Sequence, residues 1–103
     1  MLVPSKLLDS IVAYFNPARV ILFGSRARGD AGPESDVDLL VVVDDDTPPE
    51  RRSWQAAHEA RRGYHDPVDI VVCSASGYAY KRDVVGSLAH TAETEGVVVY
   101  ERH

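Results

Sequence analysis

The sequence has a single cysteine, Cys73, among its 103 residues. One thiol excludes an internal disulfide, and without a second cysteine or a paired histidine it provides no zinc site of the usual kind. Cys73 lies in an apolar run, so we interpret it as a small side chain of the hydrophobic core.

Long hydrophobic runs are also missing. No segment approaches the roughly 18 consecutive apolar residues that a membrane-spanning helix needs. Residues 1–4 start the chain without the basic segment and apolar core of a secretory leader. We therefore expect a cytoplasmic protein with no membrane partner.

Positive charge is scarce, since the formal net charge is −5 at pH 7. Nucleic-acid backbones favour basic surfaces, so we expect no direct nucleic-acid partner. The hydrophobic content of 45% and the charged content of 26% are typical of globular proteins and exclude a disordered or fibrous chain. The length predicts one domain over residues 1–103.

The hydrophobic pattern predicts alternating helices and strands. Apolar residues recur at helical spacing in some segments, whereas others are short apolar runs rich in valine, isoleucine and leucine. The predicted helices are 5–15, 48–62, 78–85 and 87–95, with a helical turn at 25–28 and a loop at 30–34; the predicted strands are 19–23, 37–43, 68–73 and 97–100. This order predicts an α/β (α+β) fold, with a mixed sheet of about four strands and helices packed mainly on one side.

The predicted helix at 48–62 contains several features of interest. Residues 47–50 fit a capping box with proline in the first turn, and Gly63 is expected to end the helix. Trp54 is expected to anchor the helix to the sheet. Four arginines, at positions 51, 52, 61 and 62, are interpreted as its solvated face, with a partner-docking face as the alternative.

Two carboxylates interrupt the start of the second predicted strand. Asp36 and Asp38 are two positions apart, so their side chains face the same way on an extended chain. Mg²⁺ prefers oxygen ligands and often joins one or two carboxylates to substrate phosphates. A solvated turn at the strand entry is the simpler alternative.

A small-residue turn, Gly24-Ser25, follows the first predicted strand. Free N–H groups at such a turn favour phosphate oxygens, and glycine allows close approach of the backbone. Arg26 and Arg28 are candidates for offsetting phosphate charge, although surface ion pairs would explain them equally well. Ser25 could alternatively be a simple helix cap.

Asp69 interrupts the third predicted strand near its start. An unpaired charge within an apolar run is costly, so we expect Asp69 to be the third carboxylate of a two-ion site. The alternative is a charge at the strand edge, paired with an arginine.

The spacing of these residues resembles a known motif. Gly24-Ser25, then ten residues, then Asp36-Val37-Asp38 is similar to the motif of the minimal nucleotidyltransferases of the DNA polymerase β superfamily. The similarity extends over nearly the whole chain, through Asp69 to residues 95–100. The arginine pattern in residues 24–29 resembles the branch that acts as antitoxin beside HEPN-domain ribonuclease toxins.

This resemblance implies transfer of AMP from ATP to a tyrosine hydroxyl of a HEPN toxin. It also implies two Mg²⁺ ions, for which Mn²⁺ can substitute. Carried over by position, Asp36 and Asp38 would bind both ions and Asp69 the catalytic ion. The residues that would bind the nucleotide are Gly24, Ser25, Arg26 and Arg28.

Two alternatives stay open. The protein could be an antitoxin that neutralises its toxin by direct binding without turnover, or a nucleotidyltransferase of the aminoglycoside type that modifies a small molecule. The latter needs an acceptor pocket, for which a short chain has little room. We therefore expect a hetero-oligomer in which the toxin completes the site.

Overall fold

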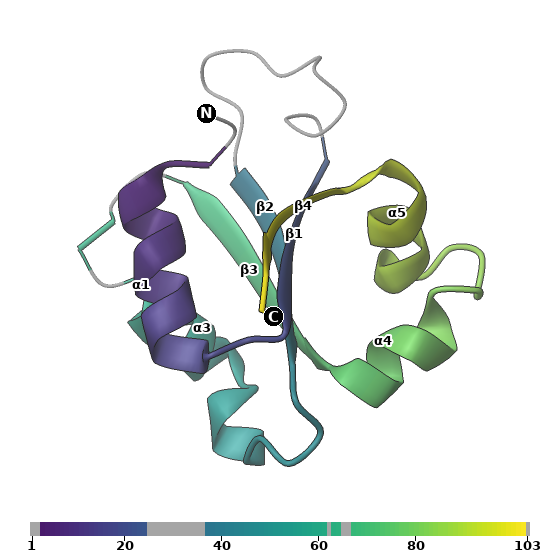
Figure 1. The fold of residues 1–103 in the computed structure, drawn as a ribbon, viewed down its shortest axis with the longest axis horizontal. Coiled ribbons are helices and arrows are strands. Elements are labelled where there is room, and N and C mark those ends of the chain that lie inside the picture. The colour runs from purple at the N-terminus through teal and green to yellow at the C-terminus, as the bar shows by residue number, and fades with distance from the viewer. Residues whose placement is uncertain (1–2, 25–36, 62, 65–66, 103) are drawn as a thin grey trace.

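The computed structural model describes residues 3–24, 37–61, 63, 64 and 67–102 (Figure 1). The predicted turn at 25–28 and the loop at 30–34 lie outside these residues. The helices are α1 (Ser5–Phe15), the 3₁₀ helix η1 (Pro49–Arg51), α3 (Trp54–Ala60), α4 (Ala75–Lys81) and α5 (Leu88–Glu95). The strands are β1 (Arg19–Phe23), β2 (Val37–Val43), β3 (Val68–Ser74) and β4 (Val97–Glu101).

The four strands form one mixed sheet in the order β3-β2-β1-β4. β1 pairs antiparallel with both β2 and β4, whereas β2 and β3 are parallel. The predicted α/β class and the four-stranded mixed sheet are therefore confirmed. β1 ends, and β2 and β3 both begin, at the same end of the sheet (Figure 1).

The helices cover both faces of the sheet, so the prediction that they pack mainly on one side is wrong. α1 and α3 pack on the face that carries Val20, Leu22 and Leu39. α4 and α5 pack on the opposite face, against Ile21 and Leu40 (Figure 1). The physical reason is that β1 and β2 are apolar on both sides, and a strand of that kind needs cover on both faces.

Helix α1 has the bounds that its pattern predicts. It buries Leu7, Ile11 and Phe15, which lie on one face at helical spacing. Asn16 ends the helix in the left-handed conformation with φ 47°, and its N–H donates to the Val12 carbonyl at 2.9 Å.

The predicted helix at 48–62 is interrupted. η1 and α3 are separate because Ser53 is extended, with φ −83° and ψ 165°, and caps α3 by accepting a hydrogen bond from the Ala56 N–H at 3.2 Å. Trp54 does not anchor the helix, since its side chain is 78% exposed. Alanines 56, 57 and 60 are buried instead, and α3 ends at Ala60, before Gly63.

The fourth helix begins earlier than predicted, at Ala75 and not at Tyr78. Ser74 caps it by accepting a hydrogen bond from the Gly77 N–H at 3.1 Å. Serine and glycine in the first turn hide the helical period, because Tyr78 is the one buried residue of this helix. Helix α5 and strand β4 match their predictions to within one residue at each end.

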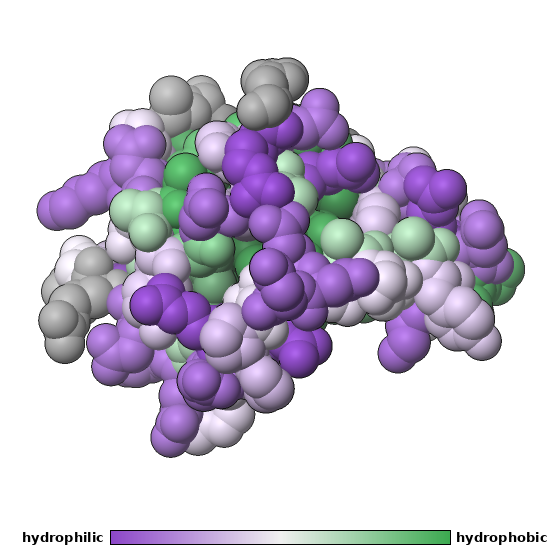
Figure 2. All heavy atoms as spheres, turned by 60° about the horizontal axis from the view of Figure 1, so that its bottom comes forward, coloured by the Kyte–Doolittle hydropathy of each residue, from purple (hydrophilic) through white to green (hydrophobic). Residues whose placement is uncertain are grey.

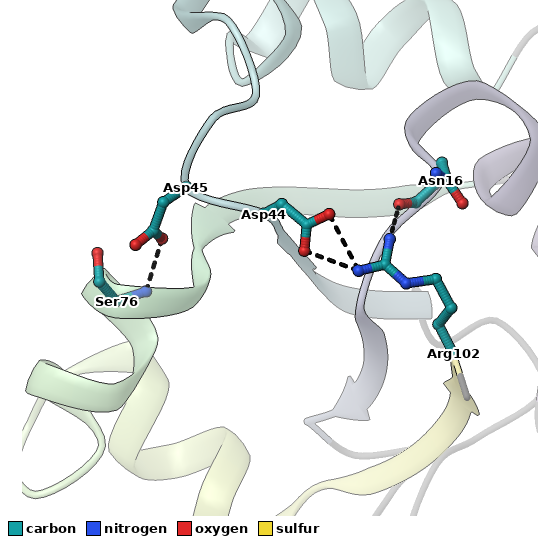
Figure 3. Close-up of polar contacts among 5 residues, drawn as sticks. All are labelled: Asn16, Asp44, Asp45, Ser76 and Arg102. Carbon is teal, nitrogen blue, oxygen red and sulfur yellow. Dashed lines mark hydrogen bonds and ion pairs between the residues drawn. The ribbon is translucent and has the colours of Figure 1, made fainter.

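Charged side chains at the other end of the sheet, where β2 and β4 finish, form a compensated network (Figure 3). Nη2 of Arg102 donates to both carboxylate oxygens of Asp44 at 2.8 and 3.0 Å, and its Nη1 donates to the Asn16 carbonyl at 3.0 Å. Asp45 accepts a hydrogen bond from the Ser76 N–H at 2.9 Å. Figure 2, in which this end is turned forward, shows a surface that is mostly hydrophilic. Within the described ranges, no helix has the length and apolarity that crossing a bilayer requires.

Candidate functional site

Three of the predicted site residues meet at one end of the sheet. Gly24 follows the last residue of β1, and Asp38 and Asp69 are each the second residue of their strands. Asp38 is the register partner of Phe23 on β1 and of Asp69 on β3. The expectation that Asp69 lies on the strand next to Asp38 is therefore confirmed.

Asp38 and Asp69 lie on the same face of the sheet, because register partners on parallel strands point the same way. Neighbouring strands are only about 4.8 Å apart, so the two side chains extend from adjacent backbone positions. Val37 and Leu39, which flank Asp38, are buried on the opposite face among the core side chains. Asp38 is half-buried and Asp69 is exposed. Like charges at paired positions destabilise a sheet, and a cation between them offsets that cost.

Gly24 lies directly against the Asp38 carboxylate. A Cβ built on Gly24 would overlap Oδ2 of Asp38 and would be 3.2 Å from its Cγ. The φ of Gly24 is +80°, a conformation that other residues rarely adopt. The left-handed conformation favours glycine here, and a Cβ at this position would displace the Asp38 carboxylate.

Ser25, Arg26, Arg28 and Asp36 lie outside the described residues, so their roles stay predictions. Among the residues that the structure does describe, no group of three histidine, cysteine, aspartate or glutamate side chains could hold a metal ion. Asp38 and Asp69 nevertheless fit part of the oxygen donor set that Mg²⁺ prefers, on two adjacent strands. Asp36, the other carboxylate predicted for this site, stays a prediction.

Sequence reasoning missed one residue beside the site, Arg61. It was interpreted as part of a solvated helix face, but its side chain is partly buried and bonds to two backbone carbonyls. Arg61 and Asp69 line the same hollow of about 180 Å³, which Trp54 and His58 also border. The available signal was its position directly after the last helical residue, where arginines can bond nearby carbonyls.

Cys73 is half-buried and packs against the cluster that contains Ile21 and Leu40. Burial raises the pKa of its thiol to about 11, so it is protonated at neutral pH. These features agree with the interpretation of Cys73 as a packing residue.

The chain belongs to the nucleotidyltransferase domain family, whose model matches residues 4–89. The matched segment includes Gly24, Asp38 and Asp69, which the fold brings together. A protein of Methanocaldococcus jannaschii named "putative protein adenylyltransferase" is 38% identical over 81 residues, which are 79% of this chain and 77% of that protein. The family and this relative support a transferase.

Two solved structures share the fold. One is described as a "putative nucleotidyltransferase" from Sulfolobus solfataricus; it has a TM-score of 0.62 and 23% identity, over 94% of this chain and 76% of that one. The other is described as a toxin-antitoxin with AMP-PNP; it has a TM-score of 0.64 and 20% identity, over 98% of this chain and 76% of that one. The agreement with both extends over nearly the full length of the chain.

Proposed function

We propose that this protein transfers AMP from ATP to a tyrosine hydroxyl of a HEPN-domain toxin and thereby acts as its antitoxin. The observation that carries the proposal is the pairing of Asp38 with Asp69 on adjacent parallel strands, with Gly24 packed against the Asp38 carboxylate. Family membership supports nucleotidyl transfer, and the relative named for protein adenylyl transfer supports a protein acceptor.

The reaction forms a bond between the acceptor oxygen and the α-phosphorus of ATP. The bond from the α-phosphorus to the oxygen that bridges the α- and β-phosphates breaks, pyrophosphate leaves, and the hydroxyl proton passes to solvent. Divalent cations, when bound, would stabilise the negative charge that develops on the phosphate oxygens. Asp38, Asp69 and the predicted Asp36 would hold these cations and thereby fix the position of the α-phosphate, where the reaction takes place.

The turn that begins at Gly24 would bind the terminal phosphates. Gly24 directly follows β1 with a left-handed φ, and its own backbone lies against the Asp38 carboxylate. We assign Ser25 and its backbone N–H to the phosphates, and Arg26 and Arg28 to the charge of the departing pyrophosphate.

The toxin partner is proposed from two lines of support. The motif and its arginine pattern resemble the antitoxin branch of minimal nucleotidyltransferases, and one structural neighbour with the same fold is a toxin-antitoxin with AMP-PNP. A toxin that presents a tyrosine would supply the acceptor and form a hetero-oligomer with this chain.

The test is to incubate the protein with ATP labelled on the α-phosphate, Mg²⁺ and the product of the adjoining reading frame. We expect label on a tyrosine of the toxin. Asp38→Asn should lower the rate by more than about 100-fold, because even residues that merely support metal ligands are worth 10- to 100-fold. Asp46→Asn, which removes an exposed carboxylate outside the site, should keep the wild-type rate.

Three results would contradict the proposal. Absence of label at every ratio of the two proteins would remove the enzymatic claim. Full neutralisation of the toxin by Asp38→Asn would favour an antitoxin that acts by direct binding. Equal loss of rate in Asp46→Asn would show that the effect is general and does not come from the site.

A further inference from the structure

Arg61 joins the end of α3 to the start of β3. It is the C-cap residue of α3, and its side chain bridges two backbone carbonyls. Nε and Nη2 donate to the Tyr64 carbonyl at 3.4 and 3.2 Å, and Nη1 donates to the Val68 carbonyl at 3.3 Å. One guanidinium therefore holds both sides of the connection that leads into β3.

The Val68 carbonyl lies on the side of β3 that faces away from β2. The carbonyl of Pro67 accepts a hydrogen bond from the Val37 N–H on β2 at 3.4 Å, and successive carbonyls along a strand point to opposite sides. Among the described residues, no strand pairs with the outer side of β3. Arg61 thus supplies the donor that a further strand would otherwise provide.

We propose that Arg61 is a positioning residue for Asp69. Asp69 directly follows Val68, so the carbonyl that Arg61 holds belongs to the peptide group that leads into Asp69. By fixing this peptide group, Arg61 keeps Asp69 in register with Asp38 at the outer edge of the sheet. This inference rests on the proposed function, because it assigns Arg61 to the cation site of that reaction.

The arginine side chain suits this role by its shape. Its guanidinium is a planar group with several donors in fixed directions, so it can bond two carbonyls at once. A lysine keeps the charge but cannot bridge both carbonyls in the same way. The pair of substitutions Arg61→Ala and Arg61→Lys therefore separates the bridge from the charge.

The experiment measures Mn²⁺ binding by the paramagnetic signal of the free ion, with kcat and KM for ATP measured alongside. We expect Arg61→Ala to weaken Mn²⁺ binding by about 10- to 100-fold, the usual effect of losing a group that orients a ligand. It should also lower kcat more than it raises KM for ATP. Arg61→Lys should show most of the same loss.

Arg51→Ala is the matched control. Nη1 of Arg51 also donates to a backbone carbonyl, that of Tyr14, at 2.8 Å, and its guanidinium lies 4.9 Å from the centre of the Tyr14 ring. Arg51→Ala therefore removes a bond from an arginine to a backbone carbonyl, as Arg61→Ala does, but away from the site. We expect a lower Tm for this variant but unchanged Mn²⁺ binding.

Several outcomes would overturn the assignment. Wild-type Mn²⁺ binding and kcat in Arg61→Ala would reduce Arg61 to a purely structural role, as would equal losses in Arg51→Ala. A raised KM for ATP with unchanged Mn²⁺ binding would mean direct contact with the nucleotide, and full rescue by Arg61→Lys would mean that charge alone matters. Absence of Mn²⁺ binding by the unsubstituted protein would instead contradict the proposed function and the inference with it.

Discussion

At one end of the sheet, Asp38 and Asp69 are direct neighbours on adjacent strands, and at the other end Asp44 accepts two hydrogen bonds from Arg102. Both arrangements put carboxylates at the ends of strands. At the Arg102 end, a cation of the protein itself compensates the carboxylate. At the Asp38 end, the fold puts two carboxylates at paired positions on adjacent strands, an arrangement that suits a bound cation. Under the proposed function, the Arg102 end supports the fold and the Asp38 end would support chemistry.

The largest effect at the Asp38 end should come from the substitution Gly24→Ala. A methyl group there would overlap the end of the Asp38 side chain, which can rotate away. We therefore expect a loss of stability of about 1–2 kcal/mol from the left-handed conformation alone, together with a fall in AMP transfer of more than about 10-fold from the displaced carboxylate. Denaturant unfolding and transfer rates measure the two effects.

Gly86→Ala is the control for this prediction. Gly86 also has a left-handed φ, of +92°, but a Cβ built on it meets nothing within 4 Å. It should lose the same stability and keep full activity. Equal activity in the two variants would show that the Asp38 carboxylate does not need the space that Gly24 leaves.

Removing Arg102 should have a smaller effect, confined to stability. Arg102→Ala leaves Asp44 and the Asn16 carbonyl without these bonds at an exposed site, where ion pairs contribute little. We expect a modest fall in Tm that becomes smaller at high salt, with unchanged transfer. Arg82→Ala, at an exposed arginine beyond α4, should leave both unchanged. Loss of AMP transfer in Arg102→Ala would show that the two ends of the sheet are coupled, and the contrast between them would be wrong.

Near neutral pH the smallest effect should come from ionisation of Tyr78, which lines the same hollow as Arg102. Burial, together with the hydrogen bond that its hydroxyl donates to Glu93, raises the pKa of Tyr78 from 10.0 to about 12. Between these pH values the unfolded chain loses this proton and the folded protein keeps it. Tyr78 therefore contributes stability that is complete below pH 10 and is lost as the pH rises toward 12.

Urea unfolding at several pH values from 9 to 12 checks this prediction for Tyr78. The variant Tyr78→Phe should lose less stability over that interval than the wild type does. An identical pH profile for the two proteins would mean that Tyr78 ionises in the folded state as it does in the unfolded chain.

The sequence predicted the parts of the fold in which one signal dominates. The bounds of α1, β1 and β2 match because apolar periodicity and the Asn16-Pro17 stop agree with each other. The break at Ser53 was missed because the capping box at residues 47–50 offers an equally good start, and only tertiary packing selects between two caps. The burial of alanines in α3 in place of Trp54 has the same origin, since a small side chain lets the helix approach the sheet closely.

The structure places Gly24, Asp38 and Asp69 at one end of the sheet, as expected from their positions at the ends of apolar runs that form strands. Their roles stay predictions. For Arg61, the sequence indicates a position near the end of a helix but not the carbonyls that it bonds. Its bonds depend on where the chain turns after α3 and on β3 being at the edge of the sheet, and neither is encoded in local spacing.

The parallel pairing of β2 with β3 has a consequence for how the chain folds during its synthesis on the ribosome. Parallel strands cannot be joined by a tight turn, so the chain must complete η1 and α3 before β3 can align with β2. Asp38 therefore leaves the exit tunnel well before Asp69. Under the proposed function, a nascent chain whose third strand has not yet formed would lack one of the two paired carboxylates and would be unable to transfer AMP.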